Sequence, residues 1–160
     1  EIPSKQQNAR ISFGELNSPH AVRGFRHRYN LPDDGRLLEL TRLWLSPRCG
    51  KNSETRVIRI ALMLLREDVP TVCAIVSYAD PSVGHQGTIY KAAGFSDAGL
   101  GPQRYDWVPA DYQESEQFIQ TRKLPTGMKT KRGLGGLGIE AKKVTRVRKQ
   151  RWIHIYTQEV

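Results

Sequence analysis

An apolar run that directly follows an amphipathic helix constrains the fold of this chain most strongly. Across residues 54–68 the apolar side chains recur every three or four positions with charged residues between them, which predicts a helix that buries one face. Pro70 ends this helix, and residues 71–77 are almost continuously apolar, as in a strand buried on both faces. With a strand before this helix and a short helix after the buried strand, the elements form a βαβα series, which favours an α/β fold.

Other segments extend this pattern in both directions. Residues 9–16 alternate like a strand, residues 20–36 are a polar excursion ending in a turn, and residues 37–46 are a strongly apolar strand. After the buried strand, a loop at 84–87 leads into a short helix at 88–93 that Gly94 closes. This order favours a sheet with its functional site at the carboxyl ends of the strands.

The positive charge of the chain is confined to its last quarter. Residues 1–121 hold 14 basic and 14 acidic side chains, whereas residues 122–160 hold 11 basic and two acidic ones, which accounts for the net charge of +9. A loose basic segment binds double-stranded DNA through counterion release, and the alternative is a solvated tail that only aids solubility. We predict DNA contacts from Lys129, Lys131, Arg132, Lys142, Lys143, Arg146 and Arg148.

The length of 160 residues suits about one ordinary domain. Within it we expect a catalytic core at 1–121, a basic glycine-rich arm or loop at 122–148, and a final strand at 149–160 that returns to the sheet. The run at 133–138 holds four glycines and is too flexible to bury a core. The glycines therefore predict an arm that adapts to its partner.

Cysteine and hydropathy patterns exclude several classes of protein. Cys49 and Cys73 form no C-x-x-C pair, which argues against a disulfide framework and a zinc ribbon. No apolar run reaches the roughly 18 residues that a membrane span needs, and the first five residues do not resemble a signal peptide. We expect a cytoplasmic protein with no membrane partner and no metal site of diagnostic spacing, and the oligomeric state stays open.

A loop between a strand and a helix start is the first candidate site. Residues 48–53 lie where the free N–H groups of a helix amino end can hold a pyrophosphate, helped by the charges of Arg48 and Lys51. The alternative is that Ser53 is simply the helix cap and that no ligand binds. The candidate cofactor-binding residues are Arg48, Gly50, Lys51, Asn52 and Ser53.

Two polar residues follow the buried strand. Asp80 stands just past its carboxyl end, where the catalytic groups of open α/β sheets cluster, and His85 comes soon afterwards. An aspartate there can accept a proton or orient an amine, and a histidine can shuttle a proton. The alternative is an ordinary Asp-Pro turn with a loop histidine. The residues by themselves leave both interpretations open.

Two blocks of sequence resemble a known family. Residues 77–95, SYADPSVGHQGTIYKAAGF, are similar to the S-Y-A-D-P … G-H-x-G-T-I-Y-x-A-x-x-F signature of the Mom-type DNA-modification proteins, and residues 52–56, NSETR, resemble that family's N-S-E-S-R stretch. Residues 89–95 also resemble the Y-x-x-x-G-F element of the acyl-CoA N-acyltransferase (GNAT) superfamily, of which the Mom-type proteins are a divergent branch. The similarity covers roughly residues 11–107 and, more loosely, residues 149–152.

The resemblance implies a fold and a reaction. The fold is a GNAT-like mixed sheet, splayed at its centre and flanked by helices. The reaction converts the adenine N6 amine of phage DNA to a carbamoylmethyl-type group, which protects the DNA from restriction. The implied catalytic residues are Asp80, Tyr90 and Ser77, with Tyr90 as general acid toward the CoA thiolate, although a packed core tyrosine is the alternative. We expect Tyr78 and His85 to contact a flipped adenine.

The implied cofactor is acetyl-CoA or a related acyl donor, or else iron. The superfamily's pyrophosphate loop reads Q/R-x-x-G-x-G/A, and with Arg48 in its first position Lys51 and Ser53 stand where glycines belong. Iron would use Asp80, His85 and Tyr78 as ligands. The superfamily domain also has a strand, one or two helices and another strand before the part that resembles residues 9–16, so we expect N-terminal elements to be missing or trimmed.

Two other functions stay open. One is an ordinary N-acetyltransferase acting on a protein or a small amine with Tyr90 as the acid, against which the glycine-poor loop counts. The other is a non-catalytic basic DNA-binding or virion component that kept the fold and lost the chemistry.

Overall fold

The computed structural model describes residues 8–111 and 130–157. Contacts group the chain into two compact units. One unit comprises the residues up to Ala79 together with Gly87–Gly99 and the residues from Arg151, and the other comprises Asp80–Gln86 and Leu100–Gln150. The predicted boundary at 121/122 lies outside the described residues.

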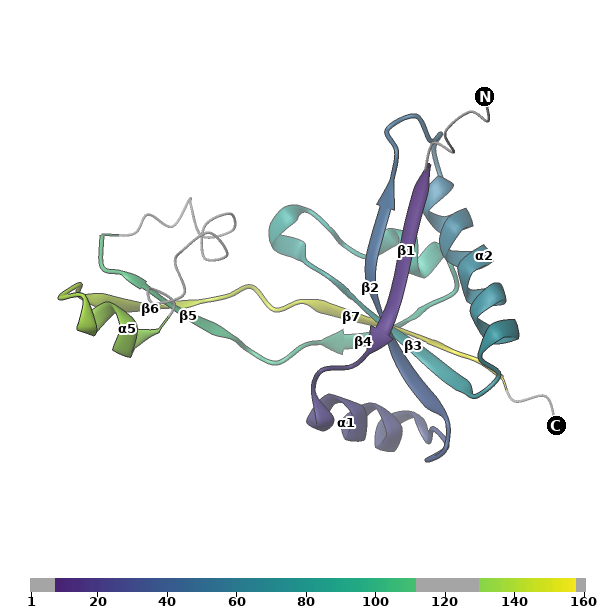
Figure 1. Ribbon diagram of the computed structural model, residues 1–160, viewed down its shortest axis with the longest axis horizontal. Helices are drawn as coiled ribbons and strands as arrows, with labels where there is room; N and C mark the ends of the chain where they lie inside the picture. Colours follow the sequence, from purple (N-terminus) through teal and green to yellow (C-terminus); the bar gives the residue numbers. More distant parts are fainter. Residues whose placement is uncertain (1–7, 112–129, 158–160) are drawn as a thin grey trace, which may run out of the picture. The chain divides into compact units, whose positions relative to one another are not determined.

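The first unit is built on a mixed five-stranded sheet in the order β1-β2-β3-β7-β4 (Figure 1). Strand β1 (Ala9–Glu15) pairs antiparallel with β2 (Arg36–Leu45), and β2 pairs parallel with β3 (Val72–Ala79). Strand β7 (Gln150–Ile155) lies between β3 and β4 (Ser96–Leu100), so the end of the chain enters the middle of the sheet. A mixed sheet flanked by helices confirms the predicted fold class.

Strand β3 is buried on both faces, as its apolar sequence predicts. Its residues Ile75 and Ala79 belong to a cluster that includes Ile58 of helix α2 (Ser53–Asp68). Its alternate residues belong to a second cluster that includes Phe25 of helix α1 (Pro19–Tyr29). Since successive side chains of a strand point to opposite faces, α1 and α2 cover opposite faces of the sheet. A third helix, α3 (Thr88–Ala92), packs on the α2 side through Ile89.

The expected polar excursion at residues 20–36 is wrong, because helix α1 occupies much of it. The Ser18 side chain caps the helix by accepting a hydrogen bond from the Ala21 N–H (3.3 Å), Pro19 stands in the first turn, and Asn30 closes the helix with a left-handed backbone. Only Phe25 is fully buried from this helix. One buried side chain gives too weak a periodicity to distinguish a helix from a loop.

The second unit contains a two-stranded antiparallel ribbon of β5 (Tyr105–Pro109) and β6 (Ala141–Thr145). Helix α5 (Lys131–Gly136) packs on it, burying Leu134 completely. The Thr130 hydroxyl caps this helix by accepting the Gly133 N–H at 3.0 Å. The described part of the predicted flexible arm therefore contains a helix and a strand, because a cap and one buried leucine offset the glycines.

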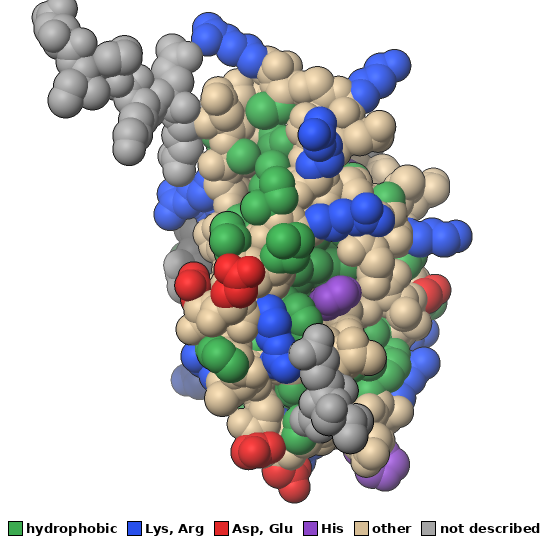
Figure 2. Space-filling model, turned by 90° about the vertical axis from the view of Figure 1, so that its right-hand side faces the viewer, with side chains coloured by type: hydrophobic (Ala, Val, Ile, Leu, Met, Phe, Trp, Pro, Cys, Tyr) green, Lys and Arg blue, Asp and Glu red, His purple; other side chains and the backbone are tan. Residues whose placement is uncertain are grey.

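The outward face of α2 carries apolar side chains among charged ones. Ile60, Met63 and Leu64 are all exposed there, and Figure 2 shows hydrophobic side chains gathered among Lys and Arg on this side of the molecule. In the described ranges, 8–111 and 130–157, no helix combines the length and hydropathy of a membrane span.

The inner and outer faces of α2 predict opposite results for two isoleucines. Ile58 is 0% exposed in the first cluster, so Ile58→Ala should lower the free energy of unfolding by about 3 kcal/mol. Ile60 has the same chemistry on the same helix but is 56% exposed, so Ile60→Ala should cost less than about 1 kcal/mol. Urea denaturation measures both values, and equal losses would contradict the assignment of the two faces.

Candidate functional site

Strands β2 and β3 separate part-way along their length. Their parallel pairing joins residues 36–39 to residues 72–76 and ends with the pair Glu39 and Val76. Beyond that point β2 continues to Leu45 paired with β1, and Figure 1 shows β2 and β3 running apart. The sheet therefore has the central splay that the family resemblance implies.

Ser77 is the first residue of β3 beyond the paired segment. Its side chain is 1% exposed, and its Oγ atom has no hydrogen-bond partner among the described residues. An unpaired buried hydroxyl costs about 1–3 kcal/mol. Tyr29 Oη and Trp152 Nε1 are also buried without a partner among the described residues. The Ser77 hydroxyl differs in its position, which is suited to a polar group of a ligand that enters where the strands diverge.

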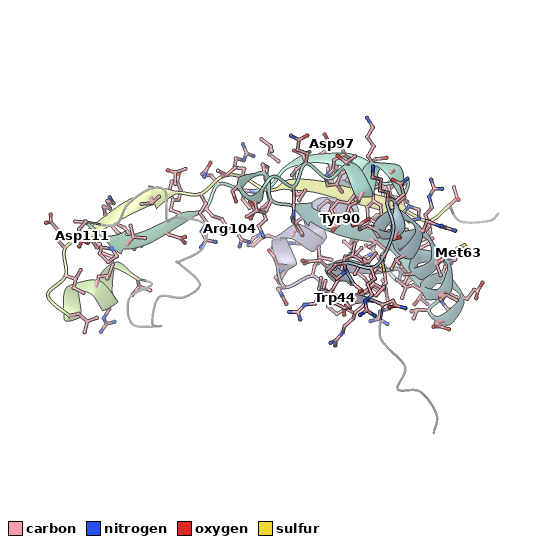
Figure 3. All side chains as sticks on the ribbon, turned by 90° about the horizontal axis from the view of Figure 1, so that it is seen from above. Trp44, Met63, Tyr90, Asp97, Arg104 and Asp111 are labelled. Carbon is pink, nitrogen blue, oxygen red and sulfur yellow. The ribbon has the colours of Figure 1, made fainter. Side chains whose placement is uncertain are left out.

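Ser77 and Tyr90 lie on the same face of the sheet. Alternation along β3 places Ser77 on the face of Ile75 and Ala79, and Tyr90 of α3 packs against the cluster that contains both (Figure 3). The Tyr90 ring is half-buried, with its centroid 5.6 Å from that of Phe95. Its packing against Phe95 fits a core tyrosine, and its position on the Ser77 face leaves a catalytic role available.

Sequence reasoning gave no role to His154, which continues this row of rings. The Phe95 and His154 ring centroids are 5.5 Å apart, and those of His154 and Tyr156 are 4.9 Å apart. The alternating apolar and polar residues of β7 allow the strand to be predicted from the sequence. The contact of His154 with Phe95 could not be predicted in this way, because the two residues are distant in sequence.

Tyr78 lies apart from Ser77 although the two are adjacent in sequence. Its half-buried side chain packs against the cluster on the α1 face, together with Tyr29. The predicted substrate-binding tyrosine and the predicted catalytic serine therefore point to opposite faces of β3.

The loop before α2 leaves the start of the helix without a side-chain cap. The cap residue is Asn52, in a left-handed conformation with φ 64°, and it makes no side-chain capping hydrogen bond. Ser53 is the first helical residue, so the alternative interpretation of Ser53 as the cap is wrong. The Ser53 N–H donates to the Gly50 carbonyl oxygen at 3.3 Å. The following N–H groups of the first turn and the exposed Arg48 and Lys51 side chains are suited to bind an anion here.

Asp80 and His85 belong to the second unit. The Asp80 Oδ1 atom accepts hydrogen bonds from the Ser82 N–H (3.1 Å) and the Ser82 hydroxyl, which caps the short 3-10 helix η1 (Pro81–Val83). The backbone N–H of the exposed His85 donates to the Asp80 carbonyl oxygen at 3.1 Å. Asp80 is therefore a turn residue in its local structure, whatever further role it has.

The iron hypothesis gains no support from the arrangement of side chains. Within the part of the chain that the structure describes, no three His, Cys, Asp or Glu side chains come close enough to hold a metal ion.

The predicted DNA-binding residues are placed in the second unit, except for Lys129, which lies outside the described residues. Arg146 forms an ion pair with Asp106, and Arg148 donates a hydrogen bond to the Gly101 carbonyl oxygen at 2.7 Å. These two arginines thus also stabilise the unit. The remaining four belong to α5 and β6: Lys131, Arg132, Lys142 and Lys143.

A pocket of about 830 Å³ lies at the other end of β3 from Ser77. It is lined by residues of α1 and the following loop, together with Cys73 and Tyr156. Burial raises the pKa of the Cys73 thiol, which Arg26 partly opposes, and burial raises the pKa of Tyr156 to about 12, against the effect of Arg66. This pocket contains none of the predicted catalytic or cofactor-binding residues.

Comparison with known proteins gives three similarities. The sequence model of the Mom protein family matches residues 7–160. The Methylcarbamoylase mom of Escherichia phage Mu is 37% identical over 90 residues, which are 56% of this chain and 36% of that protein, so the match spans just over a third of the relative's length. A solved structure, AAC(6')-Ib in complex with paromomycin and acetyl-CoA, has 25% identity and a TM-score of 0.35, covering 41% of this chain and 37% of that one.

Gly87, the last glycine of the G-H-x-G block, faces Trp152. Its φ is +77°, and a Cβ atom there would lie 2.0 Å from Trp152 Nε1, so Gly87→Ala should lower the free energy of unfolding by about 3 kcal/mol. Gly84 has nearly the same φ, +79°, with nothing within 4 Å, so Gly84→Ala should cost only about 1 kcal/mol. Thermal denaturation of both variants separates the cost of the steric contact with Trp152 from the cost of the left-handed backbone, which both variants share. Equal costs would exclude the contact with Trp152.

Ser77→Ala tests whether the buried hydroxyl is unpaired. Because the substitution removes a hydroxyl that has no partner, the free energy of unfolding of the protein alone should stay unchanged or rise by about 1 kcal/mol. Denaturant titration without added ligand gives this value. A decrease of more than about 2 kcal/mol would mean that the hydroxyl stabilises the fold through a partner of its own.

Proposed function

Because the chain belongs to the Mom protein family, we propose that it is a transferase that modifies the N6 amine of adenine in double-stranded DNA. The phage Mu relative is named a methylcarbamoylase, and the proposed product here carries a carbamoylmethyl- or acyl-type group at N6. Such a group protects phage DNA from restriction enzymes in the cytoplasm of an infected or prophage-bearing bacterium. The family match over residues 7–160 supports this proposal.

The unpaired hydroxyl of Ser77 is the observation that carries the proposed site. It is buried where β2 and β3 stop pairing, on the face that also holds Tyr90. A ligand that enters the splay could satisfy this hydroxyl, and Tyr90 would then act as a general acid toward the leaving group.

The amino end of α2 is the proposed site for the donor. An acyl donor such as acetyl-CoA, or a related compound, carries phosphates that the first-turn N–H groups could bind, with Arg48 and Lys51 adding charge. Asn52 makes no side-chain cap that would compete for these N–H groups. When bound, the donor supplies the activated group that is transferred. The loop residues assigned to it are Arg48, Gly50, Lys51, Asn52 and Ser53.

The acceptor amine must leave the base stack before it can react. Flipping costs a few kcal/mol, and we propose that contacts to DNA phosphates from the basic residues after 128 offset it. Of the two residues predicted to contact the flipped adenine, His85 keeps that assignment. Tyr78 loses it, because its side chain packs on the α1 face, away from Ser77 and Tyr90.

Transfer forms a C–N bond at N6 and breaks the bond between the transferred group and its carrier, whose leaving group takes the proton of Tyr90. An acyl-CoA would give an acyl product, and a carbamoylmethyl product would need a donor that carries that group. The amine releases one proton, which Asp80 is assigned to accept.

Asp80→Ala tests whether Asp80 accepts a proton in the reaction or only caps the turn that it forms with Ser82. In cells expressing the chain, modified deoxyadenosine measured by mass spectrometry of nucleosides should fall at least about 100-fold in this variant. Asp97 is the matched control, because its Oδ1 atom also accepts a backbone N–H two residues later, that of Gly99, at 2.6 Å. Asp97→Ala should leave the modification unchanged.

Several outcomes would contradict the proposal. Unmodified DNA in cells that contain folded wild-type protein would exclude a DNA-modifying transferase. An acetylated protein or amine instead would favour an N-acetyltransferase, and DNA binding without any modification would favour a non-catalytic binder. If Asp80→Ala behaves like Asp97→Ala while modification persists, Asp80 only caps the turn.

A further inference from the structure

The β5–β6 ribbon has two unlike faces. Its register pairs Trp107 with Lys143 and Val108 with Lys142, so Trp107, Lys143 and Tyr105 project from one face and Val108 from the other. Val108 and Leu134 of α5 are both fully buried, which indicates that α5 covers the Val108 face. The opposite face keeps Tyr105 51% exposed. Arg104 and Asp111, labelled in Figure 3, flank β5.

We call this open surface the aromatic face, defined by Tyr105, Trp107, Lys143 and Thr145. Two lysines lie over its rings. The Lys143 Nζ atom is 4.0 Å from the centroid of Tyr105, and the Lys131 Nζ atom is 5.3 Å from the centroid of Trp107. Cation–π attraction places each ammonium group over a ring, and both lysines are exposed. A base that stacks on a ring face covered in this way must displace the lysine, whose ammonium group then becomes available to a phosphate.

The surrounding chain is strongly basic. Residues 130–149 carry seven Lys and Arg and one acidic residue, Glu140. Positive charge without rings would suit any polyanion, and rings without charge would suit an apolar partner. The combination suits single-stranded nucleic acid, whose bases stack on aromatic side chains while its phosphates contact lysines.

We propose that the aromatic face binds unpaired DNA bases, with Tyr105 and Trp107 stacking on the bases and Lys131 and Lys143 contacting the phosphates. This inference rests on the proposed function in one respect, namely that DNA is the substrate. An adenine that leaves the duplex also leaves its partner base unpaired and unstacked. The exposed ring of Tyr105 can stack only on a base that is not already stacked in a duplex, so the aromatic face selects opened DNA.

Fluorescence anisotropy of the full chain with labelled oligonucleotides tests this preference. The probes are a single strand, the matched duplex and the same duplex with a central mismatched bubble. We expect the single strand and the bubble to bind more tightly than the duplex. Tyr105→Ala should weaken binding to both by about tenfold, and Tyr105→Phe, which keeps the ring, should bind like the wild type.

Salt dependence separates stacking from charge. Lys143→Ala should reduce the slope of log affinity against log salt by about 0.7 for the single strand, since one phosphate contact is lost. Tyr105→Ala should lower the affinity without changing that slope.

The first unit supplies a matched pair of controls. Trp44 on β2 is 47% exposed, and its register partner on β1 is Arg10, so the two form an aromatic and cationic pair outside the aromatic face. Figure 3 labels Trp44 on the first unit. Trp44→Ala and Arg10→Ala should change the affinity less than about twofold, and circular dichroism of every variant establishes that it is folded.

Unchanged affinity of Tyr105→Ala for the single strand and the bubble would overturn the inference, and so would an equal loss in Trp44→Ala. Weakened binding of Tyr105→Ala to phosphatidylserine vesicles, with DNA binding intact, would assign the face to a membrane surface instead. If the chain modifies DNA but its affinity for DNA does not depend on Tyr105, only this inference is refuted. Tyr105-dependent binding by a chain that modifies no DNA would refute only the proposed function.

Discussion

The burial of β3 on both faces is the constraint on which the first unit depends. Residues 72–77 are all buried. Val72 and Ile75 belong to the cluster under α2, and Cys73, Ala74 and Val76 belong to the cluster under α1. A strand with so little polar surface can lie only in the middle of a sheet, so β2 and β7 must flank it and the helices must cover it. The position of β3 thereby fixes the position of every element that contacts it.

The same strand connects the fold to the candidate site. Its first half is held by parallel pairing with β2, and its second half continues without that neighbour. Ser77 stands at this change, and among the described residues its buried hydroxyl has no hydrogen-bond partner. We assign this hydroxyl to ligand binding. Gly87 contributes to the fold, because its missing side chain lets α3 begin against Trp152.

Dense apolar patterns made part of the fold predictable from the sequence. The helix expected at 54–68 is α2, and the strand expected at 71–77 is β3, each within two residues at either end. Helix α1 was missed because it buries only Phe25, and β4 because a five-residue strand with one buried residue, Ala98, carries little signal. Local sequence also misassigned the helix cap to Ser53, since the left-handed backbone of Asn52 is set by the loop.

Individual residues of the candidate site could be predicted from the sequence, but their arrangement in space could not. Ser77 and Tyr90 were found through the family resemblance, but their common face depends on pairing between distant strands. The aromatic face has the same origin, because Tyr105 and Lys143 are 38 positions apart and meet only through the β5–β6 register. Sequence patterns report what a segment buries, and they do not report which distant segment it meets.

Transfer of a group to the N6 amine of adenine would change the mass of the DNA. We would measure the intact mass of a duplex with a single adenine after incubation with the purified chain and a bacterial extract that supplies the donor. The control is the same duplex in which purine, which lacks the amine, replaces adenine. We expect a mass increase for the adenine duplex alone. No increase in either duplex, or an equal increase in both, would contradict the proposed transfer.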